Sequence, residues 1–266
     1  RLCATVNTPW NLRCPLSLLG IMLLDPLLLL RAYAIGVFPM SDDREADEIY
    51  WVEPKKRAIL PLRGFHLSRS MAKLIRSDRF RVSVDEDFRG IVRLCAQSAE
   101  DRPTTWINHD IEESYARLHR LGFAHSVECW EGGELVGGLY GVALGRAFFG
   151  ESMVSRRTDA SKVALGWLVG RMLLAGMTLL DCQFMTDHLR SLGAIEISQR
   201  DYRTLLDAAL SAVSLADESA LLSAGPAAGL AFAPDLSAAL TVSGPVSGQV
   251  IVQLLQPIAG KLARRT

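Results

Sequence analysis

Residues 127–193 read VECWEGGELVGGLYGVALGRAFFGESMVSRRTDASKVALGWLVGRMLLAGMTLLDCQFMTDHLRSLG, and this segment decides the fold. Apolar residues alternate at its start, and the pairs Gly132–Gly133 and Leu144–Gly145 mark two tight turns. Alternation between such turns predicts an antiparallel meander that ends near Phe149. Gly137–Gly138 lies inside the middle strand, where glycines indicate a bulge or a close approach of two backbones.

The second half of this segment alternates between helix and strand. Its apolar spacing predicts a helix from Asp159 to Ala175, ended by Gly176, and then a strand from Met177 to Gln183. A further short helix is expected from Thr186 to Leu192, and one before the meander from Asp110 to Leu121. This order predicts an α+β fold, with a mixed sheet flanked by helices.

The N-terminal region contains an apolar stretch, Leu16–Leu30, whose composition also suits a secretion signal or a membrane span. Asp25 and Pro26 interrupt it, and the uninterrupted run Leu18–Leu24 is far shorter than the roughly 18 residues that a membrane helix needs. Asp25 as N-cap and Pro26 in the first turn instead predict a helix from Pro26 to Ile35 in a protein with no membrane segment.

The composition narrows the class of protein. A hydrophobic content of 49% over 266 residues predicts a folded chain with a sizeable core. Twenty-nine basic and twenty-nine acidic residues give a net charge of zero, so any basic site must be local. Five cysteines without a C-x-x-C pair, and five histidines without metal-ligand spacing, predict reduced thiols, a cytoplasmic location and no metal.

Charge is unevenly distributed along the chain. Residues 41–53 hold six acids and one base, which predicts a solvated loop, whereas residues 54–81 hold nine bases and one acid. Such a density of bases suits a phosphate backbone, although a solvated face without a ligand would have the same composition.

The C-terminal part differs from the rest. From Thr204 to Gly260 there is no Lys or Arg, and Ala and Ser dominate, which predicts a low-complexity tail from about residue 211. Within it, only Gln249–Leu255 has the composition of a strand.

Glu151 is the first candidate for a functional residue. It lies in Gly150–Met153, where the meander ends and a helix is about to begin, so that a cleft is expected there. The hydrolase motif G-x-S-x-G is incomplete at Val154, which argues against Ser152 as a nucleophile. A carboxylate at such a place can bind a guanidinium or an ammonium group, and an ion-paired structural Glu is the alternative.

Asp181 and Gln183 are the second candidate. They end an apolar strand, and alternation along it places both on one side and Cys182 on the other. A buried carboxylate beside an amide needs hydrogen-bond partners, which makes the pair a candidate polar site. The alternative is a loop-capping Asp beside a surface Gln, which would give the same sequence pattern.

Nucleotide-binding motifs such as G-x-x-x-x-G-K-[ST] and G-x-G-x-x-G are absent from the sequence, which argues against a nucleotide cofactor.

Nine ordered stretches of the sequence match one known family. They are Leu29–Met40, Phe65–Ser70, Thr105–Ile107, Ala124–Glu128, Leu135–Gly141, Phe149–Met153, Asp159–Lys162, Asp181–Gln183 and Asp187–His188. In these stretches the chain closely resembles the leucyl/phenylalanyl-tRNA protein transferases, from about Leu28 to Leu206.

The resemblance implies an α+β fold with a small N-terminal domain and an acyl-CoA N-acyltransferase-like catalytic domain. We place the first at residues 26–85 and the second at 86–210, after a poorly matched segment 1–25 and before a tail 211–266. It also implies an enzyme without cofactor or metal, in the cytoplasm. This enzyme would move Leu, Phe or Met from aminoacyl-tRNA to the N-terminal amine of proteins beginning with Arg or Lys, and so mark them for N-degron degradation.

The resemblance further assigns roles to residues of this chain. Asp181 and Gln183 would orient and help to deprotonate the attacking amine, and Glu151 would position the basic end of the acceptor. An apolar pocket for the donor side chain would be lined by Trp106, Tyr115, Leu139, Phe148, Met172 and Met40. Binding of the tRNA is assigned to Arg69, Lys73, Arg76, Arg79 and Arg81.

Two other functions fit part of the sequence. An acetyl-CoA-dependent N-acetyltransferase would share the fold, but Arg156–Ser161 lacks the glycines that let a backbone approach a pyrophosphate. A non-catalytic RNA-binding module is supported by the basic segment alone.

Overall fold

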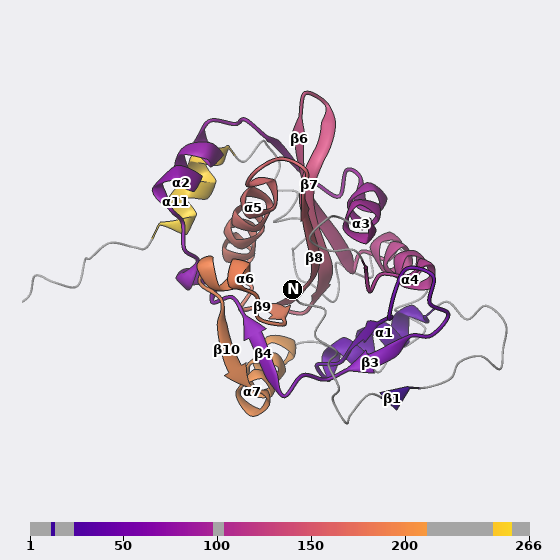
Figure 1. Ribbon diagram of the computed structural model, residues 1–266. Helices are drawn as coiled ribbons and strands as arrows, with labels where there is room; N and C mark the ends of the chain where they lie inside the picture. Colours follow the sequence, from indigo (N-terminus) through magenta and orange to yellow (C-terminus); the bar gives the residue numbers. More distant parts are fainter. Residues whose placement is uncertain (1–11, 14–23, 98–103, 212–246, 257–266) are drawn as a thin grey trace, which may run out of the picture.

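A seven-stranded sheet organises the chain in the computed structural model, which describes residues 12–13, 24–97, 104–211 and 247–256 (Figure 1). The strand order is β10-β4-β9-β8-β7-β6-β5. The seven strands are β4 (Lys56–Ile59), β5 (Arg81–Val84), β6 (Ala124–Glu131), β7 (Glu134–Leu144), β8 (Ala147–Ser155), β9 (Leu179–Gln183) and β10 (Ile195–Ser198). Neighbours are antiparallel except β8 and β9, which are parallel, so the sheet is mixed as expected.

The predicted meander is confirmed as β6, β7 and β8. Gly132 and Gly133 both have positive φ, at 59° and 85°, which is the conformation of a two-residue hairpin turn. A Cβ at Gly138 would lie 2.3 Å from the carbonyl oxygen of Val127, so the predicted close approach of backbones is also present. The register between β6 and β7 shifts beside it, between Cys129 and Trp130.

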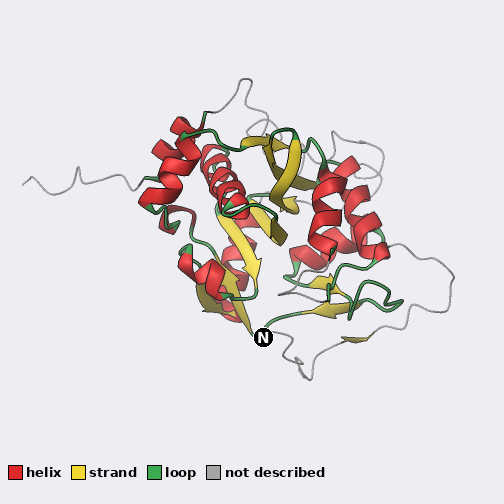
Figure 2. Cartoon of the chain, turned by 45° about the horizontal axis from the view of Figure 1, so that its top comes forward, coloured by secondary structure: helices red, strands yellow, loops and turns green. Residues whose placement is uncertain are grey.

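Helices cover both faces of the sheet (Figures 1 and 2). One face packs against α5 (Ala160–Leu174), with α2 (Arg69–Arg76) and α11 (Gly248–Leu255) outside it. The other face packs against α1 (Pro26–Ala34), α3 (Phe88–Ala96), α4 (His109–Arg120) and α7 (Gln199–Leu210). The core is therefore divided into two apolar layers by the sheet, which is the layered α+β arrangement that the sequence predicts.

The predicted helices form close to their expected ends. Asp25 caps α1 by accepting hydrogen bonds from the backbone N–H groups of Leu27 and Leu28, and Pro26 is its first residue. The expected helices at 110–121, 159–175 and 186–192 are α4, α5 and α6 (Asp187–Ser191). Among the described residues, no helix is both long and apolar enough to cross a membrane.

Three predictions of secondary structure differ from the structure. The meander was expected to end near Phe149, but β8 continues to Ser155 and contains Glu151. The loop expected at 41–53 includes a short strand, Tyr50–Val52. Gln249–Leu255 was expected to be a strand because of its β-branched residues, but it belongs to helix α11. Ile251, Val252 and Leu255 are buried, and α11 packs against α5. A Cβ added at Gly170 of α5 would lie only 2.9 Å from Ile251, so the absence of a side chain at this position lets the two helices approach. Tertiary packing onto this small residue overrides the local strand propensity.

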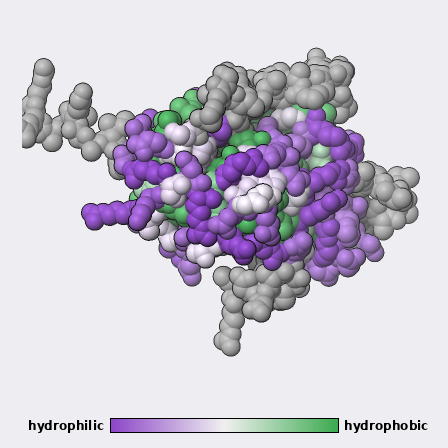
Figure 3. Space-filling view, turned by 90° about the horizontal axis from the view of Figure 1, so that it is seen from above, coloured by the Kyte–Doolittle hydropathy of each residue, from purple (hydrophilic) through white to green (hydrophobic). Residues whose placement is uncertain are grey.

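The N-terminal part forms a small sheet beside the large one. Its order is β1-β3-β2, with β1 (Leu12–Arg13), β2 (Phe38–Met40) and β3 (Tyr50–Val52). Strands β4 and β5 lie before residue 85, and both pair within the large sheet. Figure 3 shows the molecule from above, where hydrophilic side chains cover most of the visible surface of the described residues and hydrophobic side chains lie between them.

Candidate active site

The candidate site lies where two parallel strands separate. Strands β8 and β9 pair only from Ala147 with Leu179 to Phe149 with Asp181. Immediately beyond that point, a cavity of about 310 Å³ opens between them. It is lined by Met40, Trp106, Leu139, Tyr140, Gly150, Glu151, Ser152, Met153, Leu165, Leu168, Leu180, Cys182, Gln183, Phe184, Thr186, His188 and Leu189. Most of this lining is apolar, with a few polar groups, which is the usual composition of a small-molecule site.

Among the described residues that line the cavity, Glu151 alone carries a carboxylate, and it is buried, with 9% of its surface exposed. Its Oε1 accepts hydrogen bonds from Tyr33 OH at 2.7 Å and Gln183 Nε2 at 2.9 Å, and its Oε2 accepts from Tyr115 OH at 2.7 Å. Burial raises the pKa of Glu151 to about 7, although the three hydrogen bonds act in the opposite direction. No basic side chain is among these partners, so a carboxylate here is free to meet an incoming cation.

Gln183 ends β9 in an unusual conformation. Its φ is +60°, so the strand alternation predicted for residues 181–183 stops there, and Cys182 and Gln183 both line the cavity while Asp181 does not. Because its Nε2 is bonded to Glu151, its Oε1 remains available as an acceptor for a group in the cavity. A positive φ at a residue other than glycine is a strained conformation that often marks functional sites.

Asp181 lies under the cavity and is completely buried, at 0% exposure. Its carboxylate accepts hydrogen bonds from Arg57 Nε at 2.9 Å and Arg57 Nη2 at 2.6 Å, from Tyr202 OH at 2.8 Å and from the backbone N–H of Gln183 at 2.8 Å. Arg57 is 1% exposed and also donates from Nη1 to the carbonyl oxygen of Gly36. Asp181 therefore reaches the cavity only through the backbone of Gln183.

The six residues predicted to line the donor pocket divide into two groups. Met40, Trp106 and Leu139 line the cavity. Phe148 of β8 and Met172 of α5 are fully buried in the core and do not line the cavity. Tyr115 is also fully buried, and it contacts the site through its hydroxyl, which bonds Glu151.

Sequence reasoning missed three polar residues of the site. Tyr33 lies in the helix that follows Asp25, Arg57 lies in the basic segment 54–81, and Tyr202 lies in α7. Arg57 follows Lys55 and Lys56, so the sequence does not distinguish it from the other bases of this segment. Only the sheet pairing of β4 with β9 identifies Asp181 as its partner. The apolar wall formed by Leu165 and Leu168 of α5 was also missed.

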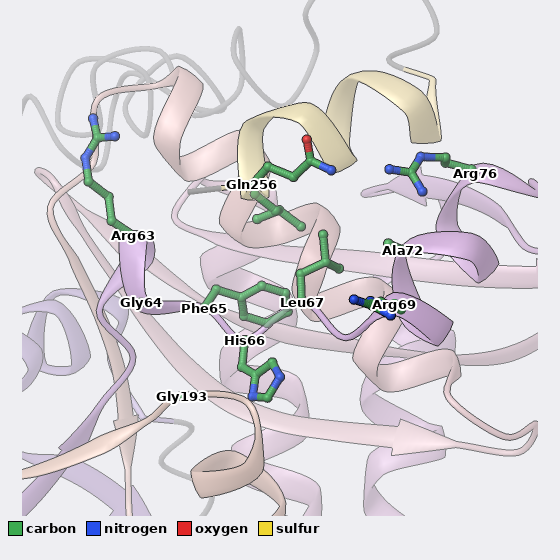
Figure 4. Close-up of a pocket in the computed structure, with 11 residues that line it drawn as sticks. Arg63, Gly64, Phe65, His66, Leu67, Arg69, Ala72, Arg76, Gly193 and Gln256 are labelled. Atoms are coloured by element: carbon green, nitrogen blue, oxygen red, sulfur yellow. The ribbon is translucent and has the colours of Figure 1, made fainter. Parts of the chain in front are cut away.

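The predicted tRNA-binding residues lie around α2. Arg69 and Arg76 line a second cavity together with Phe65, Leu67 and Gln256, the residue that follows α11 (Figure 4). Lys73 is exposed on the same helix, and no ion pair involves these three side chains among the described residues. Arg79 and Arg81 are instead paired with Glu131 at 2.8 Å and with Glu86. Of the five predicted residues, the three without an ion pair among the described residues are thus those of α2.

Two family models and several named proteins match this chain. The family model described as "Leucyl/phenylalanyl-tRNA protein transferase" matches residues 59–207, and the model of its N-terminal domain matches residues 22–55. A protein named leucyl/phenylalanyl-tRNA--protein transferase from Rhizorhabdus wittichii is 61% identical, over 87% of this chain and 97% of its own. One of the same name from Zymomonas mobilis is 63% identical, over 71% of this chain and 70% of its own. The solved structure of L-PGS from Bacillus licheniformis is 13% identical with a TM-score of 0.35, over 60% of this chain and 53% of its own, too distant to support an argument.

Proposed function

Because the chain belongs to the leucyl/phenylalanyl-tRNA protein transferase family, we propose that it moves Leu, Phe or Met from aminoacyl-tRNA to proteins that begin with Arg or Lys. The family transfers aminoacyl groups from tRNA to protein N-termini, and this chain is a transferase of that kind. The identity of the donor residue, the basic first residue of the acceptor, the cytoplasmic location and the N-degron role of the product belong to the proposal.

The observation that carries the proposal is the apolar cavity that ends at Glu151 and Gln183. Met40, Trp106 and Leu139 give it walls suited to an uncharged side chain such as that of Leu, Phe or Met. A donor side chain held there would place its ester carbonyl at the polar end, beside the amide of Gln183.

The chemistry requires little beyond alignment of the two reactants. An aminoacyl ester is already activated, so holding the ester and an amine in contact supplies much of the rate increase. The acceptor amine must be neutral to attack, and with a pKa of roughly 7.7 to 8.0 it needs only a modest base. The Oε1 atom of Gln183 would accept a hydrogen bond from this amine and direct its lone pair at the carbonyl carbon.

Asp181 would then be a positioning residue. It fixes the backbone of Gln183 through the bond to its N–H, and Arg57 and Tyr202 hold Asp181 in turn. Glu151, as the only acidic group in the cavity lining of the described residues, would receive the cationic end of the acceptor.

The body of the tRNA would bind to the basic surface of α2. Arg69, Lys73 and Arg76 would contact phosphates directly, while Arg79 and Arg81 would first have to leave Glu131 and Glu86. A minimal donor without the tRNA body would not use this surface.

One assay tests the proposal. Labelled leucyl-tRNA and a peptide beginning with Arg should give a Leu-Arg peptide bond without added nucleotide, metal or coenzyme. The control replaces leucyl-tRNA with acetyl-CoA, and transfer that depends on acetyl-CoA would overturn the proposal in favour of an N-acetyltransferase.

A further inference from the structure

A closed ring of hydrogen bonds connects Glu151 with two tyrosines. Tyr33 OH bonds Glu151 Oε1, Tyr115 OH bonds Glu151 Oε2, and the two hydroxyls bond each other. The tyrosines come from α1 and α4, both are 0% exposed, and neither lines the cavity. The cavity reaches this ring only at Glu151.

The ring contains one contact more than its hydroxyl protons can satisfy. Each hydroxyl has a single proton, so an ionised Glu151 leaves two protons for three oxygen–oxygen contacts. If both hydroxyls donate to the carboxylate, the two tyrosine oxygens face each other without a proton. A third proton, bound to Glu151, completes the ring.

The other partner of Glu151 indicates which oxygen takes this proton. Oε1 already accepts from Tyr33 and from Gln183 Nε2, whereas Oε2 accepts from Tyr115 alone. The proton therefore belongs on Oε2, from which it would donate to Tyr115, Tyr115 would donate to Tyr33, and Tyr33 would continue to donate to Oε1. Every hydroxyl in this arrangement donates once.

The charges of the buried groups around the ring also call for one added proton. In the part of the chain that the structure describes, Arg57 of β4 is the only cation of the buried cluster, and it pairs bidentately with Asp181 of β9. Glu151 adds a second carboxylate, so one proton makes the cluster neutral, as a buried group without a counter-ion requires. The remaining titratable groups facing the ring or the cavity are Tyr140 of β7, Cys182 of β9 and His188 of α6, and burial lowers the pKa of His188.

We propose that Glu151, Tyr33 and Tyr115 form a proton-holding cluster that takes up the proton released when the acceptor's ammonium group becomes the attacking amine. The inference rests on the proposed function for the source of the proton. Glu151 would touch the acceptor directly, while Tyr33 and Tyr115 would be positioning residues that fix its carboxyl group and donate to it in the ionised state, in which it can take a proton.

The step balances. The acceptor's R–NH₃⁺ transfers one proton to Glu151 Oε2 and becomes R–NH₂, whose lone pair forms the new C–N bond at the ester carbonyl carbon. The C–O bond to the ribose then breaks, and its oxygen takes a second proton from the same nitrogen. The products are the amide, the ribose hydroxyl and one proton on Glu151, which returns to water when the product leaves.

Infrared spectroscopy of the full-length protein without substrates tests the proton itself. A pH titration should show the C=O stretch of a protonated carboxyl group that disappears as the pH rises through the neutral range. Glu151→Gln should lack this band and keep its fold, since the amide can donate to Tyr115 and accept from Tyr33 as the protonated acid does. No band, or a band that persists in Glu151→Gln, would overturn the proposal without reference to transferase activity.

Single-turnover transfer at a series of pH values tests its use. The wild-type rate should rise with pH to a plateau, because only ionised Glu151 can accept the proton. Tyr33→Phe and Tyr115→Phe each remove a donor to the carboxylate, so each should move this rise to higher pH by about one pH unit. Tyr140→Phe is the matched control: its ring lies 5.5 Å from that of Tyr115, and the donors to Glu151 are Tyr33, Tyr115 and Gln183. Because Tyr140 lines the cavity, the plateau rate of this variant can change, but the pH at which the rate rises should not.

A comparison of two acceptor peptides separates this role from recognition of the basic side chain. If Glu151 takes the amine proton, Glu151→Gln should lower the transfer rate by the same factor for a peptide that begins with Arg and for one that begins with neutral citrulline. A loss confined to the Arg peptide, together with unmoved pH profiles in both Tyr→Phe variants, would return Glu151 to side-chain binding. If no transfer occurs at all but the infrared band is present, the proposed function fails and the proton-holding cluster stands.

Discussion

Two acidic residues, Asp181 and Glu151, lie in the same site, are both buried and are surrounded differently. Asp181 is held by the guanidinium of Arg57, by Tyr202 and by the backbone of Gln183, and no part of it is exposed. Glu151 has no cationic partner, accepts only from neutral groups, and lines the cavity. The paired carboxylate of Asp181 fixes geometry, whereas burial without a cationic partner raises the pKa of Glu151 to about 7.

The largest expected effect is on catalysis, and it tests whether Asp181 acts through Gln183. Gln183→Ala and Asp181→Asn should each lower kcat by on the order of 10² to 10⁴, because each disturbs the group that orients the amine. The double variant should be scarcely worse than the poorer single one, since residues acting as a unit are not additive. Steady-state transfer with donor and acceptor varied in turn measures this, with folding checked by circular dichroism, and losses that multiply would show that the two act independently.

The second prediction breaks the ion pair that distinguishes Asp181. Arg57→Met should destabilise the fold by about 3 to 5 kcal/mol, because it leaves Asp181 buried without a counter-ion. The double variant Arg57→Met with Asp181→Asn should recover part of that loss, since no unpaired buried charge remains. Denaturant unfolding at neutral pH measures both, and an equal loss in the two variants would assign the effect to packing rather than charge.

The third prediction concerns the pH dependence of stability. The pKa of Glu151 is raised to about 7, so the folded state binds a proton more tightly than the unfolded chain, and stability should fall as the pH rises from the ordinary Glu value to about 7. Glu151→Gln removes this dependence and should be more stable than wild type above pH 7, by roughly 3 kcal/mol. Unfolding at several pH values measures the difference between the two proteins, and parallel pH profiles would contradict the raised pKa.

The smallest effect per residue is expected for the solvent-exposed basic side chains of α2, which differ from both buried acids in being surrounded by water. Replacing Arg69, Lys73 and Arg76 by Gln should leave the fold intact and flatten the salt dependence of tRNA binding by about one in slope for each lost phosphate contact. Arg79→Gln and Arg81→Gln should have less effect, because these side chains are already paired with Glu131 and Glu86. Turnover of a minimal donor is the control, and an equal loss with both donors would show that the bases serve another purpose.

The sequence alone was sufficient for the elements that depend on local pattern. Turn glycines, strand alternation and the Asp25–Pro26 helix start are short-range signals, and β6, β7, β8, α1 and α5 form where those signals place them. The strand expected at Gln249–Leu255 failed because its β-branched residues carry the same local signal in a helix that packs against Gly170. Glu151, Asp181 and Gln183 could be selected because each is a polar residue shortly after apolar residues of the same strand.

Only the tertiary structure decided what each selected residue can do. Asp181 meets Arg57 across 124 positions of sequence, and Glu151 meets Tyr33 across 118, so no local pattern could reveal either pairing. The positive φ of Gln183 turns it away from the alternation of its strand and into the cavity, which a period of two cannot predict. Charge, proton affinity and access to substrate depend on desolvation and on partners brought together by the sheet, and for that reason the fold rather than the residue type separates the roles of the two acids.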